Sequence, residues 1–209
     1  LDKRGTLYLI AIGIDAYPLL PASLCTNKDA DGNPTCNLNF PGKDAAAFHQ
    51  AMLKGLGSLH ERVVDRLLVN APGKLAPTAD AIRDAFGLLS VAKPNDTVAV
   101  FLSGHGYNEG QNFLLVPTDA EWSKETGSFR RSRAVLWSEI QVALQNAQGR
   151  RILFMDTCHS GNSHAGALED AAYYANIIAY YSARWDQLAI ESAQYGHGVF
   201  TKAVVEGLE

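Results

Sequence analysis

Apolar positions in this chain of 209 residues fall into short continuous runs that alternate with stretches of helical spacing. The first run, Thr6–Ile14, is apolar at nearly every position, which is typical of a central parallel strand buried on both faces. Lys43–Leu56 instead repeats its apolar side chains, among them Phe48 and Met52, at the spacing of one helix face. The chain therefore begins with a predicted strand, a turn-rich insertion and a predicted helix.

The same alternation continues to the end of the chain. Further strands are predicted at Arg62–Val69, Asp96–Gly106, Asn112–Asp119, Arg151–Met155 and Asn176–Arg184. Further helices are predicted at Pro77–Val91, with Thr78 as the N-cap, at Leu136–Ala147 and at Gly196–Leu208. Strands that alternate with helices predict an α/β fold with a mainly parallel sheet flanked by helices on both faces. A chain of this length suits one such domain, over residues 1–209.

The composition and net charge of the chain bear on whether it binds nucleic acids or membranes. Hydrophobic residues make up 47% of the chain and charged residues 19%, which is ordinary for a globular domain. The net charge of −4 gives no electrostatic reason to expect binding to nucleic acid or to an anionic membrane. No apolar run approaches the ~20 residues of a membrane-spanning helix. We therefore expect neither a nucleic-acid partner nor a membrane partner for this segment.

In Asp96–Gly106, and again in the stretch that begins at Arg151, an apolar strand runs abruptly into a short glycine-bearing turn with chemically active side chains. Ser103–Gly106 reads SGHG, and DTCHSG begins at Asp156. Because the carboxyl ends of parallel strands meet at one edge of a sheet, His105 and Cys158 are expected to lie at the same edge. This joint placement favours a nucleophilic thiol over a structural thiol, and a metal site would lack its remaining ligands.

A cysteine nucleophile needs a base and donors for the oxyanion. His105 is the predicted partner, either as the general base or as the imidazolium of a thiolate pair. The backbone N–H groups of Gly106 and Cys158 are the candidate oxyanion donors. His159 is the weaker base candidate, because neighbouring side chains in an extended segment point apart.

The turn-rich insertion holds the other two cysteines, Cys25 and Cys36, and two alternatives stay open for them. A disulfide between them would favour an oxidising, extracytoplasmic compartment, whereas free thiols would favour the cytoplasm. Asp29 and Asp31 lie between them at alternate positions and offer oxygen ligands to calcium. The Glu that a calcium loop of this type needs at its twelfth position is Phe40 here, so a solvated turn is the default expectation.

The spacing of the two glycine-bearing motifs resembles a known family. SGHG followed 53 residues later by DTCHSG is similar to the caspase-like cysteine peptidases, in particular to metacaspases and bacterial orthocaspases. LYLIAIGIDAY, FPGKDAAAF, YYSARWDQLAIES and GHGVFTKAVVEGL resemble other parts of the same family. The resemblance implies a caspase-like fold with a six-stranded type of sheet. Residues 1–158 are then the large-subunit-like region and residues 172–209 the small-subunit-like region, with a truncated end as one alternative.

The resemblance also implies an activity, the cleavage of peptide bonds after Arg or Lys. In metacaspases acidic residues recognise the P1 side chain, and the matching positions here are Asp44, Asp156, Asp186 and Glu191. A carboxylate pocket would bind a guanidinium or ammonium group through charge-assisted hydrogen bonds. Without such a role, Asp44 is a helix N-terminal acid and Asp156 a strand-end cap. The chemistry itself needs no cofactor, although many metacaspases depend on calcium.

Two other functions are kept as alternatives, a catalytically silent caspase-like scaffold and a peptidase specific for Asp at P1. Self-processing is a separate question. No Lys or Arg occurs from His159 to Ala183, so an enzyme specific for basic residues has no cleavage site there. We expect an enzyme that is active as a single chain or is processed elsewhere, with FRRSR at Phe129–Arg133 as the candidate loop.

Overall fold

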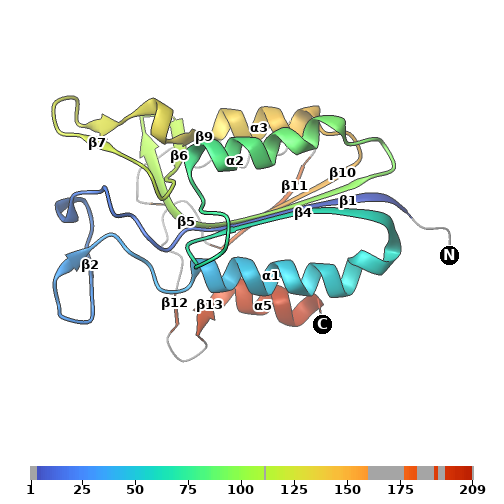
Figure 1. Ribbon diagram of the computed structural model, residues 1–209, viewed down its shortest axis with the longest axis horizontal. Coiled ribbons are helices and arrows are strands. Elements are labelled where there is room, and N and C mark those ends of the chain that lie inside the picture. Colours follow the sequence, from blue (N-terminus) through green and yellow to red (C-terminus); the bar gives the residue numbers. More distant parts are fainter. Residues whose placement is uncertain (1–3, 111, 160–176, 183–190, 193–195, 209) are drawn as a thin grey trace.

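A central sheet lies between two layers of helices in the computed structural model (Figure 1). The model describes residues 4–110, 112–159, 177–182, 191–192 and 196–208. Five parallel strands form the sheet in the order β11 (Ile178–Tyr181), β10 (Arg150–His159), β5 (Thr97–Glu109), β1 (Arg4–Gly13) and β4 (His60–Val69). Two short antiparallel strands extend it: β6 (Asn112–Leu115) pairs with the C-terminal part of β5, and β9 (Val135–Leu136) pairs with β6.

The helices divide between the two faces of the sheet. One face carries α1 (Pro41–Leu56) and α5 (Val199–Leu208), and the other carries α2 (Ala79–Gly87) and α3 (Trp137–Asn146). The predicted α/β class and mainly parallel sheet are therefore confirmed. The remaining elements are the hairpins β2–β3 (Asn27–Lys28, Pro34–Thr35), β7–β8 (Trp122–Ser123, Ser128–Phe129) and β12–β13 (Glu191–Ser192, His197–Gly198), and the 3₁₀ helices η1 (Ala22–Leu24), η2 (Gly57–Leu59), η3 (Leu88–Val91) and η4 (Arg131–Arg133).

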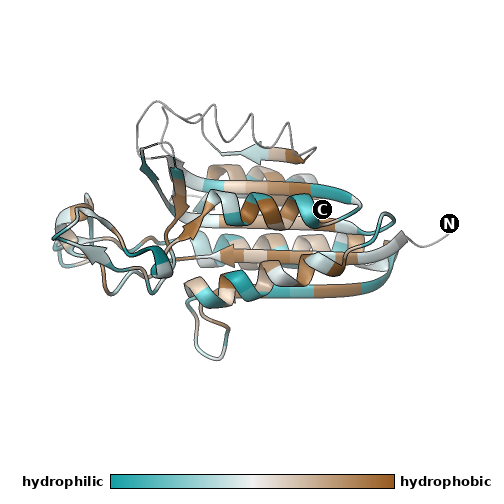
Figure 2. Cartoon of the chain, turned by 90° about the horizontal axis from the view of Figure 1, so that it is seen from above, coloured by the Kyte–Doolittle hydropathy of each residue, from teal (hydrophilic) through white to brown (hydrophobic). Residues whose placement is uncertain are grey.

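Both faces of the sheet are apolar, as the continuous runs in the sequence predict. Successive residues of a strand point to opposite faces, so β1 supplies both cores. Leu7, Leu9 and Ala11 pack toward α1 and α5, whereas Tyr8, Ile10 and Ile12 belong to the larger cluster on the side of α2 and α3. Figure 2 shows that hydrophobic residues are concentrated in the strands and helices.

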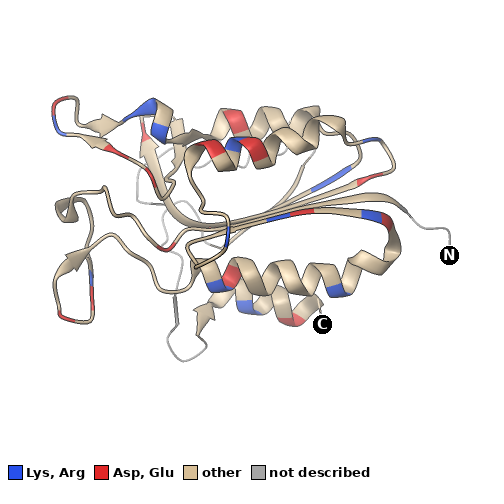
Figure 3. Ribbon diagram, viewed as in Figure 1, with Lys and Arg blue, Asp and Glu red and all other residues tan. Residues whose placement is uncertain are grey.

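Charged residues of both signs are interspersed along the helices and the peripheral loops (Figure 3). Within the described ranges, no helix combines the length and the apolar character needed to cross a membrane.

Thr78 caps α2 as predicted, since its hydroxyl oxygen accepts a hydrogen bond from the backbone N–H of Ala81 at 3.2 Å. The helix itself is shorter than predicted, because a 3₁₀ segment replaces it at Leu88.

The two strands that bear the motifs run further than the sequence predicts. β5 continues through SGHG to Glu109, and β10 continues to His159. The expected turn after the apolar run is absent from SGHG, because β5 pairs with β10 as far as Gly106, with β1 as far as Ser103 and with β6 from Gly106 onward. Gly104 adopts a φ of 148°, a conformation that glycine tolerates far better than residues with a side chain.

Gly13 offers a test of how closely β1 approaches α1. A Cβ atom at this position would lie 2.1 Å from the carbonyl oxygen of Pro41, whereas a Cβ at Gly87 in α2 would meet nothing within 4 Å. We expect Gly13→Ala to lower the free energy of unfolding by about 1–3 kcal/mol or more. Gly87→Ala should leave it unchanged or raise it by up to about 1 kcal/mol, because alanine favours a helix. Urea unfolding followed by far-UV circular dichroism measures both, and equal stability of the two variants would contradict the close approach.

Candidate active site

Strand register brings the two predicted catalytic positions together. The Cα of Cys158 in β10 is the direct partner of the Cα of His105 in β5, and Thr157 pairs with Gly104 in the same way. Both positions lie near the carboxyl ends of neighbouring parallel strands. The backbone of Cys158 is described, but its side chain is not among the described groups. The structure thus places the two residues side by side along the backbone.

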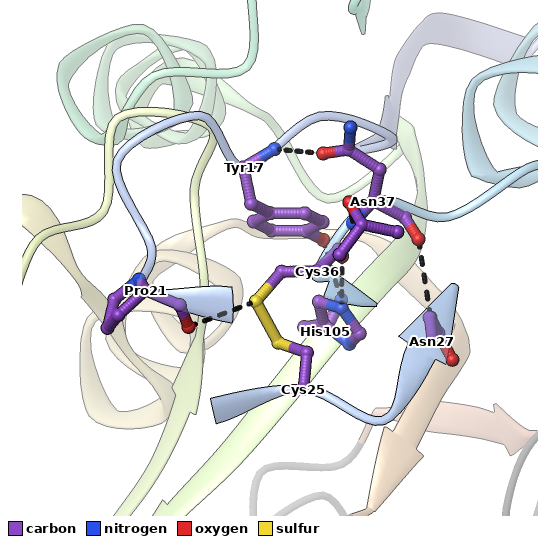
Figure 4. The surroundings of a disulfide bond; sticks show 8 residues. Tyr17, Pro21, Cys25, Asn27, Cys36, Asn37 and His105 are labelled. Atoms are coloured by element: carbon purple, nitrogen blue, oxygen red, sulfur yellow. Dashed lines mark hydrogen bonds between the residues drawn. A yellow bond between two sulfur atoms is a disulfide. The ribbon is translucent and has the colours of Figure 1, made fainter. Parts of the chain in front are cut away.

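The imidazole of His105 is held by a backbone carbonyl from the insertion (Figure 4). Its Nε2 atom lies 2.7 Å from the carbonyl oxygen of Cys36. A carbonyl oxygen only accepts hydrogen bonds, so Nε2 carries the proton, and in the neutral ring Nδ1 then bears a lone pair. Burial lowers the pKa of His105, and the bond to Cys36 acts in the opposite direction. The lower pKa favours the neutral ring with Nδ1 free of a proton.

Tyr17 fixes the backbone and the ring of the same histidine. Its hydroxyl oxygen accepts a hydrogen bond from the backbone N–H of His105 at 2.8 Å and donates to the carbonyl of Ile14 at 3.0 Å. The two ring centroids are 4.6 Å apart. A Cβ atom at Gly104 would lie 2.8 Å from this hydroxyl, so glycine allows Tyr17 to approach the strand.

Cys25 and Cys36, for which two alternatives were open, form a disulfide in the structure, with their sulfur atoms 2.01 Å apart. The hairpin β2–β3 lies between them. Asp29 closes the tip of this hairpin, because its Oδ1 accepts hydrogen bonds from the backbone N–H groups of Asp31 at 3.0 Å and Asn33 at 2.8 Å. These bonds hold a solvated turn. The described part of the chain contains no group of three or more His, Cys, Asp or Glu side chains placed to hold a metal ion.

Two of the predicted recognition acids meet on the face that carries α1 and α5. Oδ2 of Asp44 accepts a hydrogen bond from the backbone N–H of Gly198 at 3.0 Å, and Oδ2 of Asp156 accepts one from the hydroxyl of Thr201 at 2.7 Å. A Cβ atom at Gly198 would lie 2.6 Å from Oδ2 of Asp156 and 3.0 Å from Oδ2 of Asp44. Both carboxyl groups therefore converge on one glycine.

This acid pair is buried and only partly neutralised. Asp44 is 2% exposed and Asp156 is 8% exposed. Burial raises the pKa of both carboxyl groups, to about 6 for Asp44, where the charge of Asp156 adds to the effect. Nδ1 of His197 lies 2.6 Å from Oδ1 of Asp44. Within the described ranges, neither carboxyl group forms an ion pair with Lys or Arg.

The other predicted site residues are placed less completely. Asp186 lies outside the described residues. The backbone of Glu191 pairs with Gly198 in the hairpin β12–β13, which brings it beside the acid pair, but its side chain is not described. Gly106 pairs with His159 on one side and with Leu115 on the other. The roles predicted for these residues stay predictions.

Several groups of this site were missed from the sequence, namely Tyr17, the carbonyl of Cys36, His197, Gly198 and Thr201. A backbone carbonyl leaves no signature in the residue types, and Tyr17 stands in the sequence only as the last residue of the stretch that resembles the family's first strand. His197 offered a usable signal, because it lies between two glycines in GHG as His105 does. Its partner Asp44 is 153 residues away, and no local pattern announces that contact.

The arginines of the candidate processing loop, Phe129–Arg133, form ion pairs with acidic residues elsewhere in the fold. Nε of Arg130 lies 3.0 Å from Glu121, and Nη1 of Arg133 lies 2.6 Å from Asp119. Arg131 pairs with Glu109. Phe129 anchors the loop by packing edge-to-face against Tyr107 and Trp122. All three arginines are therefore engaged in the folded protein.

Comparison with known proteins agrees with the architecture and with the family resemblance. The family model described as the caspase domain of peptidase family C14 matches residues 10–209. The crystal structure of protein GSU0716 from Geobacter sulfurreducens is 18% identical in sequence. That superposition covers 97% of this chain and 81% of the other, with a TM-score of 0.63, so the two share a fold. No curated protein matches significantly. The chain has the caspase-like fold and belongs to the caspase domain family of cysteine peptidases.

Proposed function

We propose that this protein is a cysteine endopeptidase that uses Cys158 and His105 and cuts after Arg or Lys, as metacaspases do. The observation that carries the catalytic part is the register of β5 and β10. It sets Cys158 opposite a histidine whose Nε2 is already engaged by a carbonyl. A neutral imidazole held in this way offers Nδ1 as the general base.

The proposed reaction begins when Nδ1 of His105 takes the proton of the Cys158 thiol. The thiolate attacks the carbonyl carbon of the scissile peptide bond, and the backbone N–H groups of Gly106 and Cys158 stabilise the oxyanion. His105 returns the proton to the leaving amine, and the C–N bond breaks to give a thioester. A water molecule, deprotonated by His105, then hydrolyses the thioester and restores the thiol. No cofactor enters these steps.

The acid pair supports the basic P1 preference. Asp44 and Asp156 are two buried carboxyl groups on the face that carries α1 and α5, and burial raises the pKa of both, with a smaller contribution from the charge of Asp156 at Asp44. A guanidinium or ammonium group beside them would form charge-assisted hydrogen bonds and restore the ionised forms. An Asp side chain at P1 would instead add a third carboxylate to the cluster. The Asp-specific alternative is therefore disfavoured.

A fluorogenic panel with Arg, Lys or Asp at P1 tests the proposal, and His105→Ala serves as the base-deficient variant. We expect cleavage of the Arg and Lys substrates only, and a loss of about 10²–10⁴-fold in kcat for His105→Ala. Cys158→Ala should be inactive and is the matched blank. Calcium chloride and EDTA arms of the same panel test calcium dependence. A preference for Asp contradicts the specificity, and an inert wild type that an arginyl chloromethylketone does not label favours the scaffold alternative.

The raised pKa of Asp44 predicts a pH dependence. A cationic P1 side chain needs the ionised carboxylate, so kcat/KM for an Arg substrate should fall by up to about tenfold per pH unit below pH 6. Burial lowers the pKa of His105, and protonation of this base would reduce cleavage of charged and uncharged P1 substrates alike. Asp44→Asn should remove the decline and lower kcat/KM at pH 7.5. A citrulline substrate, which is uncharged but shaped like arginine, is the control, and the same decline with citrulline would contradict the assignment.

The engaged arginines of FRRSR support activity as a single chain. A peptidase binds its substrate as an extended segment, and this loop is folded, with Arg131–Arg133 in a 3₁₀ helix. We expect wild-type enzyme to remain one intact band on a denaturing gel while it cleaves an Arg substrate, next to a Cys158→Ala control. If activity appears only after cleavage within residues 159–183, the single-chain proposal is wrong.

A further inference from the structure

The disulfide and the histidine contact share one residue, Cys36. Its Sγ is bonded to Cys25, and its carbonyl oxygen accepts the hydrogen bond from Nε2 of His105. Figure 4 shows the disulfide and the hydrogen bond to His105 on the same residue. Cys36 is buried at 4% exposure and belongs to the larger core cluster, whereas Cys25 is partly exposed at its edge. The position of the carbonyl therefore depends on what holds Cys36.

The chain is well anchored after Cys36 and weakly anchored before it. Asn37 accepts a hydrogen bond from the backbone N–H of Tyr17 at 2.9 Å, and the N–H of Leu38 donates to the carbonyl of Asp15 at 2.9 Å. Residues 26–34, in contrast, are all exposed, and β2 and β3 pair over two residues each. Besides the backbone at Cys36, the disulfide is a second covalent link between this exposed hairpin and the core beside His105.

We propose that the Cys25–Cys36 disulfide positions the carbonyl of Cys36 against His105 and makes the activity sensitive to dithiol reductants. The inference rests on the proposed function for its catalytic consequence, and on the geometry alone for the state of the histidine. Once the bond is broken, Cys36 loses its covalent restraint to Cys25, and the hairpin is held to this segment only by the backbone and by the exposed hydrogen bond from Nδ2 of Asn27 to the carbonyl of Asn37 at 3.2 Å. His105 then loses the acceptor that holds its proton on Nε2.

The redox step needs a dithiol as co-reactant. One thiolate of the dithiol attacks Sγ of the more exposed Cys25, a mixed disulfide forms, and Cys36 leaves as a thiolate that takes up a proton. The second thiol of the reductant displaces Cys25 and becomes part of the oxidised, disulfide form of the reductant. Cys158, by contrast, must be a free thiol in order to react. Activity should therefore pass through a maximum at an intermediate potential.

Cys25→Ser is the informative variant, because it removes the disulfide and leaves Cys36 in place. We expect kcat for an Arg substrate to fall about 10- to 100-fold, with KM within twofold of wild type. Asp29→Ala is the matched control, since it disrupts the tip of the same hairpin and keeps the disulfide; its kcat should equal that of wild type. In redox buffers, wild type should lose activity at the reducing end and the variant should not lose it further.

Nitrogen-15 spectra of histidine-labelled protein give a readout that needs no catalysis. In oxidised wild type, His105 should be a single neutral tautomer with the proton on Nε2, and in Cys25→Ser or in reduced wild type it should become a mixture. His105→Ala identifies the signal. If Cys25→Ser does not fold, wild-type protein that has been reduced, and that keeps the circular dichroism spectrum of the native protein, takes its place.

The outcomes separate the two proposals. Unchanged kcat and an unchanged tautomer after the bond is broken overturn the inference, as do two free thiols at Cys25 and Cys36 in protein purified without reductant. A tautomer that changes on reduction, in a protein that cleaves no peptide at any potential, supports the positioning role and overturns the peptidase proposal instead.

Discussion

The parallel pairing of β5 with β10 is the constraint on which the candidate active site depends. It sets the backbone of Cys158 opposite His105. A slip of one residue in either strand would send the side chain to the other face of the sheet. The apolar residues of both strands, buried on two faces between α1 and α3, strongly disfavour such a slip. Core packing thus determines the geometry of the predicted dyad.

The site is assembled from both ends of the chain. β5 and β10 bring the histidine and the cysteine, the N-terminal insertion brings the carbonyl of Cys36, and α5 brings Thr201 to Asp156. The groups that surround His105 act on its pKa in opposite directions, since burial lowers it and the carbonyl raises it. On Asp44, burial and the charge of Asp156 act in the same direction and raise the pKa to about 6, against the hydrogen bonds from Gly198 and His197.

Much of this arrangement follows from local pattern, and the rest depends on contacts that no local pattern contains. The double-faced apolar run of β1, the helical spacing around Phe48 and the N-cap at Thr78 were predictable, because each follows from its own neighbours in the chain. The continuation of β5 through Gly104 was not, since it comes from pairing with β6 and β10. The convergence of Asp44 and Asp156 on Gly198 depends equally on where α5 packs.

That convergence has a consequence for how the chain holds together. Gly198, which directly precedes the C-terminal helix, donates its N–H to Asp44 of the first helix, and Thr201 of the C-terminal helix donates its hydroxyl to Asp156 of β10. Val204 and Leu208 of the same helix pack against the core cluster on the side of α1. These non-covalent contacts hold α5 to the rest of the fold in addition to the backbone that leads into it. A backbone broken between β10 and β11 would leave two fragments with complementary buried surfaces, so the same architecture is compatible with a one-piece and a two-piece protein.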